Sequence, residues 1–201
     1  GASGACTWNI DSTVNNTGQW ANRLALTGAI TISGQVNVTN YGNFWLSNNS
    51  VNASSAIYLN GTNTYMRVYG PAASTIKIGT LTGSGTIDFS DGGGGTSLSL
   101  SIGNDNGTGT FSGAIKNSGA SSGPTTLGLI KVGTGTQTLS GTNTYTGITT
   151  ISGGTLSVST LANGGAGSGL GSSTNIAGNL VLDGGTLQYT GAAVSTDRLF
   201  T

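Results

Sequence analysis

Glycine punctuates this chain at short, nearly regular intervals, and this spacing limits the possible folds more than any other feature. Within residues 139–158, glycine stands at Gly141, at Gly147 and at the pair Gly153 and Gly154, and the runs between are rich in Thr, Ile, Leu and Val. β-Branched and aliphatic residues favour strands, whereas glycine marks turns. The segment therefore predicts a strand–turn–strand unit of a β-solenoid.

Parts of this unit recur elsewhere in the chain. Residues 61–65 are identical to residues 141–145, and residues 153–156 are identical to residues 184–187. Apolar and polar residues also alternate, which predicts strands with one face in a core and one in water. The alternating runs lie at residues 29–32, 35–38, 56–59, 76–78, 98–102 and 156–158. At roughly 20 to 25 residues per turn of the solenoid, the chain is long enough for about eight to ten stacked layers.

The amino-acid composition narrows the possible fold classes and partners further. The chain has 37 glycines, no histidine, six acidic and six basic residues, and 35% apolar residues. Zero net charge with regular apolar positions predicts a folded chain, and the scarcity of good helix formers predicts an all-β fold with little or no α-helix. The absence of a basic run argues against nucleic acid as a partner. No apolar run is long enough for a membrane-spanning helix.

The aromatic residues divide the chain into two expected parts. All three tryptophans lie before residue 70, so we expect residues 1–70 to form an aromatic-rich cap with the first layers, and residues 71–201 to form the regular repeat region. These aromatics could instead form a stacking platform for sugar rings, although packing inside a cap or core explains them better. The candidate glycan-binding residues are Tyr41, Phe44, Trp45, Tyr58, Tyr65 and Tyr69.

Catalytic and metal chemistry has weak support in the sequence. Without histidine, no Ser-His-Asp triad, Cys-His pair or His-ligated zinc site can form. Asp88 and Asp91 could act as paired carboxylates in a polysaccharide-degrading enzyme, but Asp91 precedes four glycines, as a turn aspartate does. Residues 104–107 offer oxygen ligands for calcium, but a tight turn explains them as well. We therefore expect no enzyme activity, cofactor or metal.

Residues 109–160 combine a lysine, glycine corners and an Asn-Thr-Tyr-Thr-Gly run in one order. In this order of features the segment resembles the passenger-associated repeat of bacterial autotransporters. Residues 176–190 resemble a partial second copy. The residues that carry the repeat motif are Lys131, Gly133, Gly135, Gly141, Asn143, Thr144, Tyr145, Thr146, Gly147, Gly154, Thr155 and Leu156.

This resemblance implies a right-handed parallel β-helix that is exported and displayed on the bacterial cell surface, as one part of a longer protein. From it we predict a non-enzymatic stalk or fibre segment. Its expected partners are further copies of itself, stacked end to end or side by side, or glycans of a host or cell surface. A surface adhesin or glycan-binding module is the first alternative, and a polysaccharide-degrading β-helix enzyme is the second.

Overall fold

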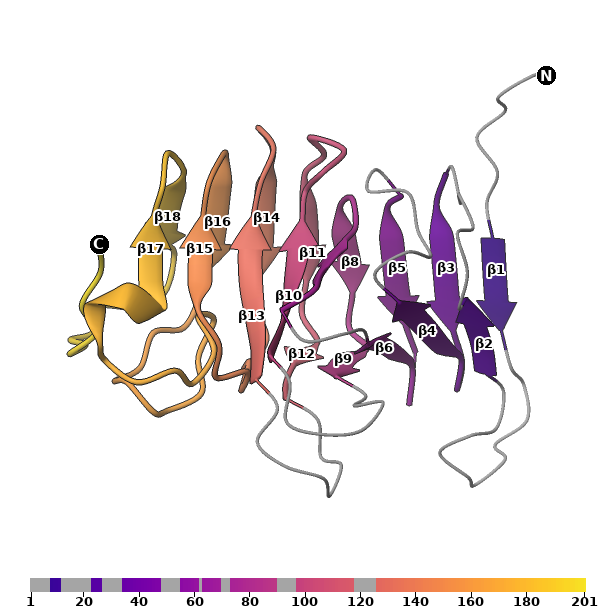
Figure 1. The fold of residues 1–201 in the computed structure, drawn as a ribbon, viewed down its shortest axis with the longest axis horizontal. Helices are drawn as coiled ribbons and strands as arrows, with labels where there is room; N and C mark the ends of the chain where they lie inside the picture. Colours follow the sequence, from indigo (N-terminus) through magenta and orange to yellow (C-terminus); the bar gives the residue numbers. More distant parts are fainter. Residues whose placement is uncertain are drawn as a thin grey trace.

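The structure, a computed structural model, describes residues 8–11, 23–26, 34–47, 55–61, 63–69, 73–89, 97–117 and 126–201. Its strands stack along the long axis of the molecule, from β1 at the N-terminal end to β17 and β18 at the C-terminal end (Figure 1). Every strand pairing among the described residues is parallel. The fold is therefore the predicted parallel β-helix.

Three sheets form the sides of the helix. The first sheet has eight strands in the order β1-β3-β5-β8-β11-β14-β16-β18, the second has the order β17-β15-β13-β10-β7, and the third has the order β12-β9-β6-β4-β2. The first sheet runs through all layers, whereas the second lies toward the C-terminal end and the third toward the N-terminal end.

The first sheet consists of β1 Trp8–Asp11, β3 Val36–Thr39, β5 Ile57–Asn60, β8 Leu81–Gly83, β11 Gly109–Phe111, β14 Thr136–Leu139, β16 Thr155–Val158 and β18 Thr186–Tyr189. The second consists of β7 Thr75–Lys77, β10 Ser97–Ile102, β13 Thr126–Lys131, β15 Thr149–Ile151 and β17 Leu180–Leu182. The third consists of β2 Arg23–Leu26, β4 Asn43–Ser47, β6 Tyr65–Tyr69, β9 Thr86–Phe89 and β12 Ala114–Ile115.

The strand alternation predicted from the sequence is confirmed. In β3 and β5, buried residues alternate with partly or fully exposed ones, and the inward residues of successive layers stack in a core of Val, Ile, Leu, Phe and Met. Within the described ranges, the helical content is one short 3₁₀ turn, η1 Ala177–Asn179. None of those ranges contains a helix of the length and apolarity needed to cross a membrane.

The length of one layer varies along the chain. The register pairs Val36 with Ile57 and Gly109 with Gln137, separations of 21 and 28 residues, while Thr136 pairs with Thr155 after only 19. The loops absorb this variation, because the strands keep their register. The boundary predicted at residue 70 stays a prediction, and strand pairing crosses it from β6 to β9. The strand predicted at residues 29–32 lies outside the described residues.

Columns of glycine at the corners let the backbones of neighbouring layers pack closely against each other. A Cβ atom added to Gly113 would lie 1.9 Å from the Gly85 carbonyl oxygen, and one added to Gly141 would lie 2.0 Å from the Gly113 carbonyl oxygen. These three glycines stack in successive layers. The carbonyl oxygen of one glycine takes the space that a side chain on the next glycine would need. The column therefore requires glycine for reasons of space.

One buried side chain replaces a missing part of the backbone ladder. Between β8 and β11 the backbones pair only where Phe111 meets Gly83. The Gln137 side chain, 1% exposed, reaches past Gly109 to Leu81: Nε2 donates to the Leu81 carbonyl at 2.8 Å, and Oε1 accepts from the Leu81 amide at 3.1 Å. Since buried backbone groups must find partners, Gln137 completes the pairing across two layers.

Substitution of Gly113 tests the glycine column. We expect Gly113→Ala to lower the free energy of unfolding by about 1–3 kcal/mol, because the added methyl group forces two backbones apart. Gly178→Ala is the matched control, since a Cβ there meets nothing within 4 Å, and its effect should stay within about 0.5 kcal/mol. Urea denaturation measures both, and equal effects would contradict the argument.

Candidate functional site

Lys131, the lysine of the repeat motif, is buried in the core with 0% exposure. It stands between Ile102 and Ile151 in neighbouring strands, at a position where the other layers carry apolar residues. Its ammonium group donates to the carbonyl oxygens of Val132 at 2.6 Å, of Gly153 at 3.2 Å and of Gly133 at 3.3 Å. Burial lowers the pKa of Lys131, and the nearby Asp105 carboxylate opposes this. The lysine thus ties together the corners of two adjacent layers.

The glycines around Lys131 make this corner possible. A Cβ on Gly154 would lie 2.9 Å from the ammonium nitrogen and 2.4 Å from the Gly135 carbonyl oxygen, and one on Gly133 would lie 2.1 Å from the Gly103 carbonyl oxygen. Gly154 also adopts a φ of +58°, which L-residues disfavour. Gly133, Gly135 and Gly154 therefore serve the packing around Lys131.

Asn143 links three successive layers. Its Oδ1 accepts from the Ile115 amide of the preceding layer at 2.9 Å, and its Nδ2 donates to the Gly169 carbonyl of the following layer at 3.1 Å. Its own backbone exchanges two hydrogen bonds with Ser168. The third sheet ends at β12, and Asn143 continues its hydrogen bonding where no regular strand follows.

Tyr145 fills the core beside this bridge. It is fully buried, and its hydroxyl lies 2.8 Å from Thr149 Oγ1, where either atom could donate. Burial raises the pKa of the Tyr145 phenol far above its usual range, so the ring stays neutral. A Cβ on Gly171 would meet the Tyr145 ring at 2.8 Å, and one on Gly147 would lie 2.5 Å from the Leu127 carbonyl oxygen.

The remaining motif residues follow the same division between core and surface. Leu156 lies in the core, Thr155 begins β16, and Gly141 belongs to the corner column. Thr144 and Thr146 are exposed. The buried motif residues therefore make contacts between layers. In the structure, these residues hold neighbouring layers together.

The candidate glycan-binding aromatics do not form one surface. Tyr58 lies on the outward side of β5 in the first sheet. Trp45 and Tyr65 lie on the outward side of the third sheet, where Trp45 is buried with only 8% exposure and Tyr65 is partly exposed. Tyr41 stands in the turn before β4 with a positive φ of 61°. The side chain of Tyr69 lies outside the described part of the structure.

Phe44 corrects this prediction. It points into the core with 0% exposure, because it alternates with Trp45 along β4. A side chain enclosed in this way cannot present its face to a sugar ring. Phe44 is therefore a core residue.

The outward side of the third sheet carries a row of aromatic and charged groups that the sequence does not reveal. The register aligns Trp45 with Arg67, and Arg67 with Asp88. The Arg67 guanidinium lies 5.6 Å from the Trp45 ring centre and 5.7 Å from that of Tyr65, within the range of a cation–π contact. Its Nε lies 3.2 Å from Asp88 Oδ1, as an ion pair without the alignment of a hydrogen bond.

Asp88 is one of the two carboxylates that could form a catalytic pair. Burial raises its pKa, and the positive charges of Arg67 and then Lys116 oppose this. Asp91, its proposed partner, lies outside the described residues, so the pair stays untested. The Asp88 carboxylate is engaged with Arg67, which gives it a structural role in this row.

The corner at residues 104–107 uses its polar groups internally. The Asp105 carboxylate accepts from Thr80 Oγ1 at 2.8 and 2.9 Å, and from the Gly107 amide at 3.0 Å. Burial alone would raise the pKa of Asp105, but these hydrogen bonds outweigh it and lower the pKa. Among the described residues, no group of three or more His, Cys, Asp or Glu could hold a metal ion.

Arg198 makes a second set of contacts, besides those of Arg67, that the sequence does not predict. Its guanidinium donates to the carbonyl oxygens of Ala162 and Gly171 at 2.9 Å each, and to the Ser173 carbonyl at 3.3 Å. These bonds fasten the C-terminal segment to the loop before η1. No local pattern marks such an arginine, since its partners are backbone groups about 25 to 36 residues away.

The comparisons with known proteins agree with the repeat geometry. The family Passenger-associated-transport-repeat matches residues 129–158, the segment that contains Lys131, Asn143 and Tyr145. The Adhesin BmaC autotransporter of Brucella suis biovar 1 (strain 1330) is 41% identical over 155 residues, which are 76% of this chain and 4% of the relative. The chain thus spans a small part of that relative's length. No solved structure matches the chain.

Substitution of Asn143 tests the bridge between layers. We expect Asn143→Ala to lower the free energy of unfolding by about 1–3 kcal/mol for each of the two backbone groups that lose their partner. Thr144→Ala is the control, because Thr144 is the exposed neighbour and should change stability by at most about 0.5 kcal/mol. Chemical denaturation of both variants gives the comparison, and a near-neutral Asn143→Ala would rule out the proposed bridge.

Proposed function

Because this chain is a segment of an autotransporter passenger, exported to the bacterial cell surface or beyond it, we propose that it serves as a rigid, non-enzymatic stalk element. In this role it holds other parts of the passenger away from the cell. The supporting observation is the eight-stranded sheet, in which parallel pairing links successive layers from β1 to β18. A rod of stacked layers transmits force and orientation along its axis, which a flexible linker does not.

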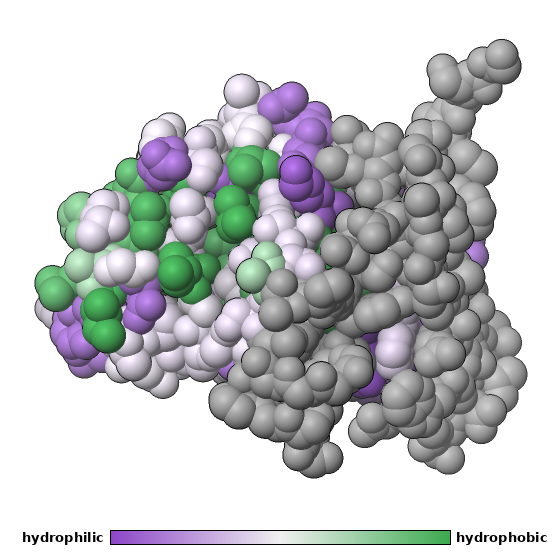
Figure 2. Space-filling model, viewed as in Figure 1, coloured by the Kyte–Doolittle hydropathy of each residue, from purple (hydrophilic) through white to green (hydrophobic). Residues whose placement is uncertain are grey.

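The buried polar groups support this proposal. Lys131, Gln137 and Asn143 all make their hydrogen bonds to backbone groups in other layers or corners. The hydrogen-bonding groups of these three side chains therefore find their partners inside the stack. The visible face of the C-terminal half shows green and pale residues over most of its area, with purple residues at its upper edge and at its lower C-terminal corner (Figure 2).

Direct adhesion is the second candidate function. The relative is named an adhesin, and Tyr58 stands partly exposed in the outward row of the first sheet, paired with Thr82 of the next layer. We propose glycans as the ligand class for this reading, because an exposed tyrosine ring can stack on a sugar. A glycan array probed with Tyr58→Ala, and with Thr82→Ala as the control in the same row, would separate adhesion from a purely structural role.

Self-association is a further part of the proposal. Among the described residues, β1 and β18 are the outermost strands of the first sheet, and the Thr201 backbone bonds to Leu180 and Leu182 as a further strand of the second sheet would. Open parallel edges accept further strands. End-to-end contact between copies would extend the rod.

Distance measurement between spin labels tests the rigid rod. Asn9 and Gln188 are both exposed and stand in one outward row of the first sheet. Labels at Asn9→Cys and Gln188→Cys, in a Cys6→Ser background, should give one narrow distance distribution near 34 Å, since about seven layer spacings of roughly 4.8 Å separate them. A chain labelled only at Gln188→Cys reports end-to-end contacts between copies. A broad distribution from the double label would count against a stalk.

A further inference from the structure

The chain contains three Asn-Gly pairs whose asparagines are all exposed: Asn60 with Gly61, Asn106 with Gly107, and Asn163 with Gly164. In such a pair, the glycine amide nitrogen can attack the side-chain amide carbon of the asparagine, because glycine carries no Cβ to hinder the approach. The pairs share the same sequence chemistry and a similar exposure. They differ in the groups that the fold places around the reacting atoms.

At Asn106 the fold supplies two groups of opposite kind. The Asp105 carboxylate accepts a hydrogen bond from the Gly107 amide, the attacking nitrogen, at 3.0 Å. The Thr134 amide of the next layer donates to Asn106 Oδ1, the oxygen of the attacked group, at 3.0 Å. A carboxylate on the nucleophile can take its proton, and a donor on the oxygen stabilises the negative charge that develops there.

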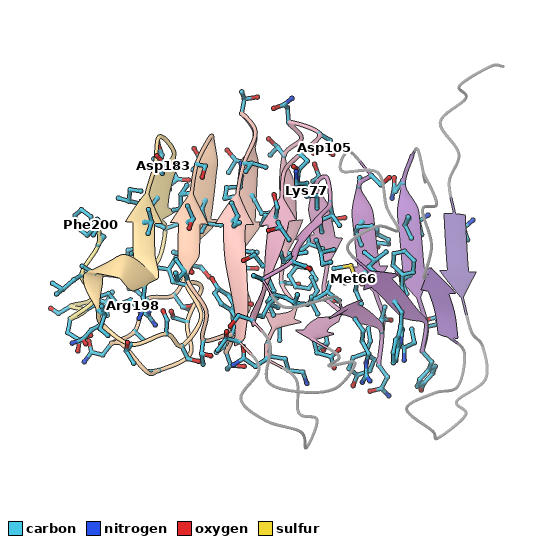
Figure 3. All side chains as sticks on the ribbon, in the orientation of Figure 1. Met66, Lys77, Asp105, Asp183, Arg198 and Phe200 are labelled. Carbon is cyan, nitrogen blue, oxygen red and sulfur yellow. The ribbon has the colours of Figure 1, made fainter. Side chains whose placement is uncertain are left out.

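Asn163 has the same arrangement, built from one distant residue. The Asp197 carboxylate accepts from the Gly164 amide at 2.7 Å, and the Asp197 backbone amide donates to Asn163 Oδ1 at 3.1 Å. Figure 3 shows Asp105 at a turn beside β10 and β11, and Arg198, the neighbour of Asp197 in sequence, at the C-terminal end of the stack. The two corners therefore share one arrangement, a carboxylate on the glycine amide and a backbone donor on the asparagine oxygen, although different residues supply these groups.

Asn60 provides the comparison within the same molecule. Its Oδ1 accepts a hydrogen bond from Ser84 Oγ at 3.1 Å, so the donor on the oxygen is present. No carboxylate of the described residues accepts from the Gly61 amide. This pair thus has the electrophilic half of the arrangement without the base.

We propose that the pairs at Asn106 and Asn163 are self-modifying sites, at which the folded protein promotes its own deamidation. The amide nitrogen of the glycine forms a bond to the asparagine Cγ, and its proton passes to the carboxylate and on to the departing amide group. The Cγ–NH₂ bond breaks and ammonia leaves, which closes a five-membered succinimide. Water then opens the ring to aspartate or isoaspartate, and no oxidant or reductant takes part.

The modification changes the corners in a defined way. Each event replaces a neutral amide by a carboxylate, so conversion of both sites takes the formal net charge from zero to two negative charges. Isoaspartate also lengthens the backbone by one carbon. At Gly107 there is no room for this, because a Cβ on Gly135 of the next layer would lie 2.0 Å from the Gly107 carbonyl oxygen. Modification at Asn106 therefore loosens the stack there.

Peptide mapping by mass spectrometry tests the proposal on the intact, folded chain incubated at neutral pH. We expect Asn106 and Asn163 to convert about tenfold faster than Asn60, less than the roughly hundredfold that a well-matched base supplies, because a carboxylate is a poor match for so weak an acid as an amide. In concentrated urea the three pairs should convert at similar rates. Equal rates in the folded chain, or slower conversion at Asn106 and Asn163 than at Asn60, would overturn the proposal.

Two variants serve as controls for each other. Asp105→Asn keeps an oxygen that can accept from the Gly107 amide but removes the base, and Asp197→Asn does the same for Gly164. Asp105→Asn should slow conversion at Asn106 about tenfold and leave Asn163 unchanged, and Asp197→Asn should do the reverse. Thermal unfolding confirms that each variant is folded. Unchanged rates at the paired site in folded variants would exclude the carboxylates as bases.

Discussion

The close spacing of the layers is the constraint on which the rest of this structure depends. Parallel strands in successive layers lie about 4.8 Å apart, and at the corners the backbones come so close that a Cβ atom has no room. The columns through Gly85, Gly113 and Gly141, and through Gly107 and Gly135, meet this constraint. The high glycine content follows from it, because each layer needs glycine wherever two corners stack.

Side chains continue the backbone pairing where regular strands stop. Gln137 pairs with Leu81 across the gap between β8 and β11, and Asn143 extends the third sheet beyond β12. Amides suit this work, since each carries both a donor and an acceptor, as a peptide group does. Lys131 adds a cation where three corner carbonyls converge. The repeat motif therefore records the places at which the layers depend on side chains.

The sequence predicts the strands well because alternation is a local property. β10 and β16 lie where runs of alternating Leu, Ser, Ile and Val predict them, and the parallel β-helix expected from the repeat motif is confirmed. The register between layers is a different matter, because layers of 19 to 31 residues can only be aligned once the loops are known. The sequence alone does not predict the contact of Arg67 with Asp88 and Trp45, because this contact depends on the register between layers.

Identical sequences also take different places. Tyr65 and Tyr145 end the same five-residue sequence, yet Tyr65 lies on the outward side of a strand and Tyr145 is fully buried. β6 continues beyond Tyr65, whereas Gly147 follows Tyr145 at a close contact with the preceding layer. The segment that follows, and not the five residues themselves, decides which way the ring points. Phe44 shows a related limit, since aromatic composition does not distinguish the two faces of β4.

Removal of one complete layer tests the central claim, that register between layers holds this stack together. Gly109 pairs with Gln137, so deletion of residues 109–136 joins Thr108 to Gln137 and keeps every later residue in register. Deletion of residues 110–136 is one residue shorter and turns inward residues outward. Circular dichroism with urea denaturation should show a cooperatively folded β protein for the first deletion and loss of cooperative folding for the second. Equal behaviour of the two deletions would contradict the account.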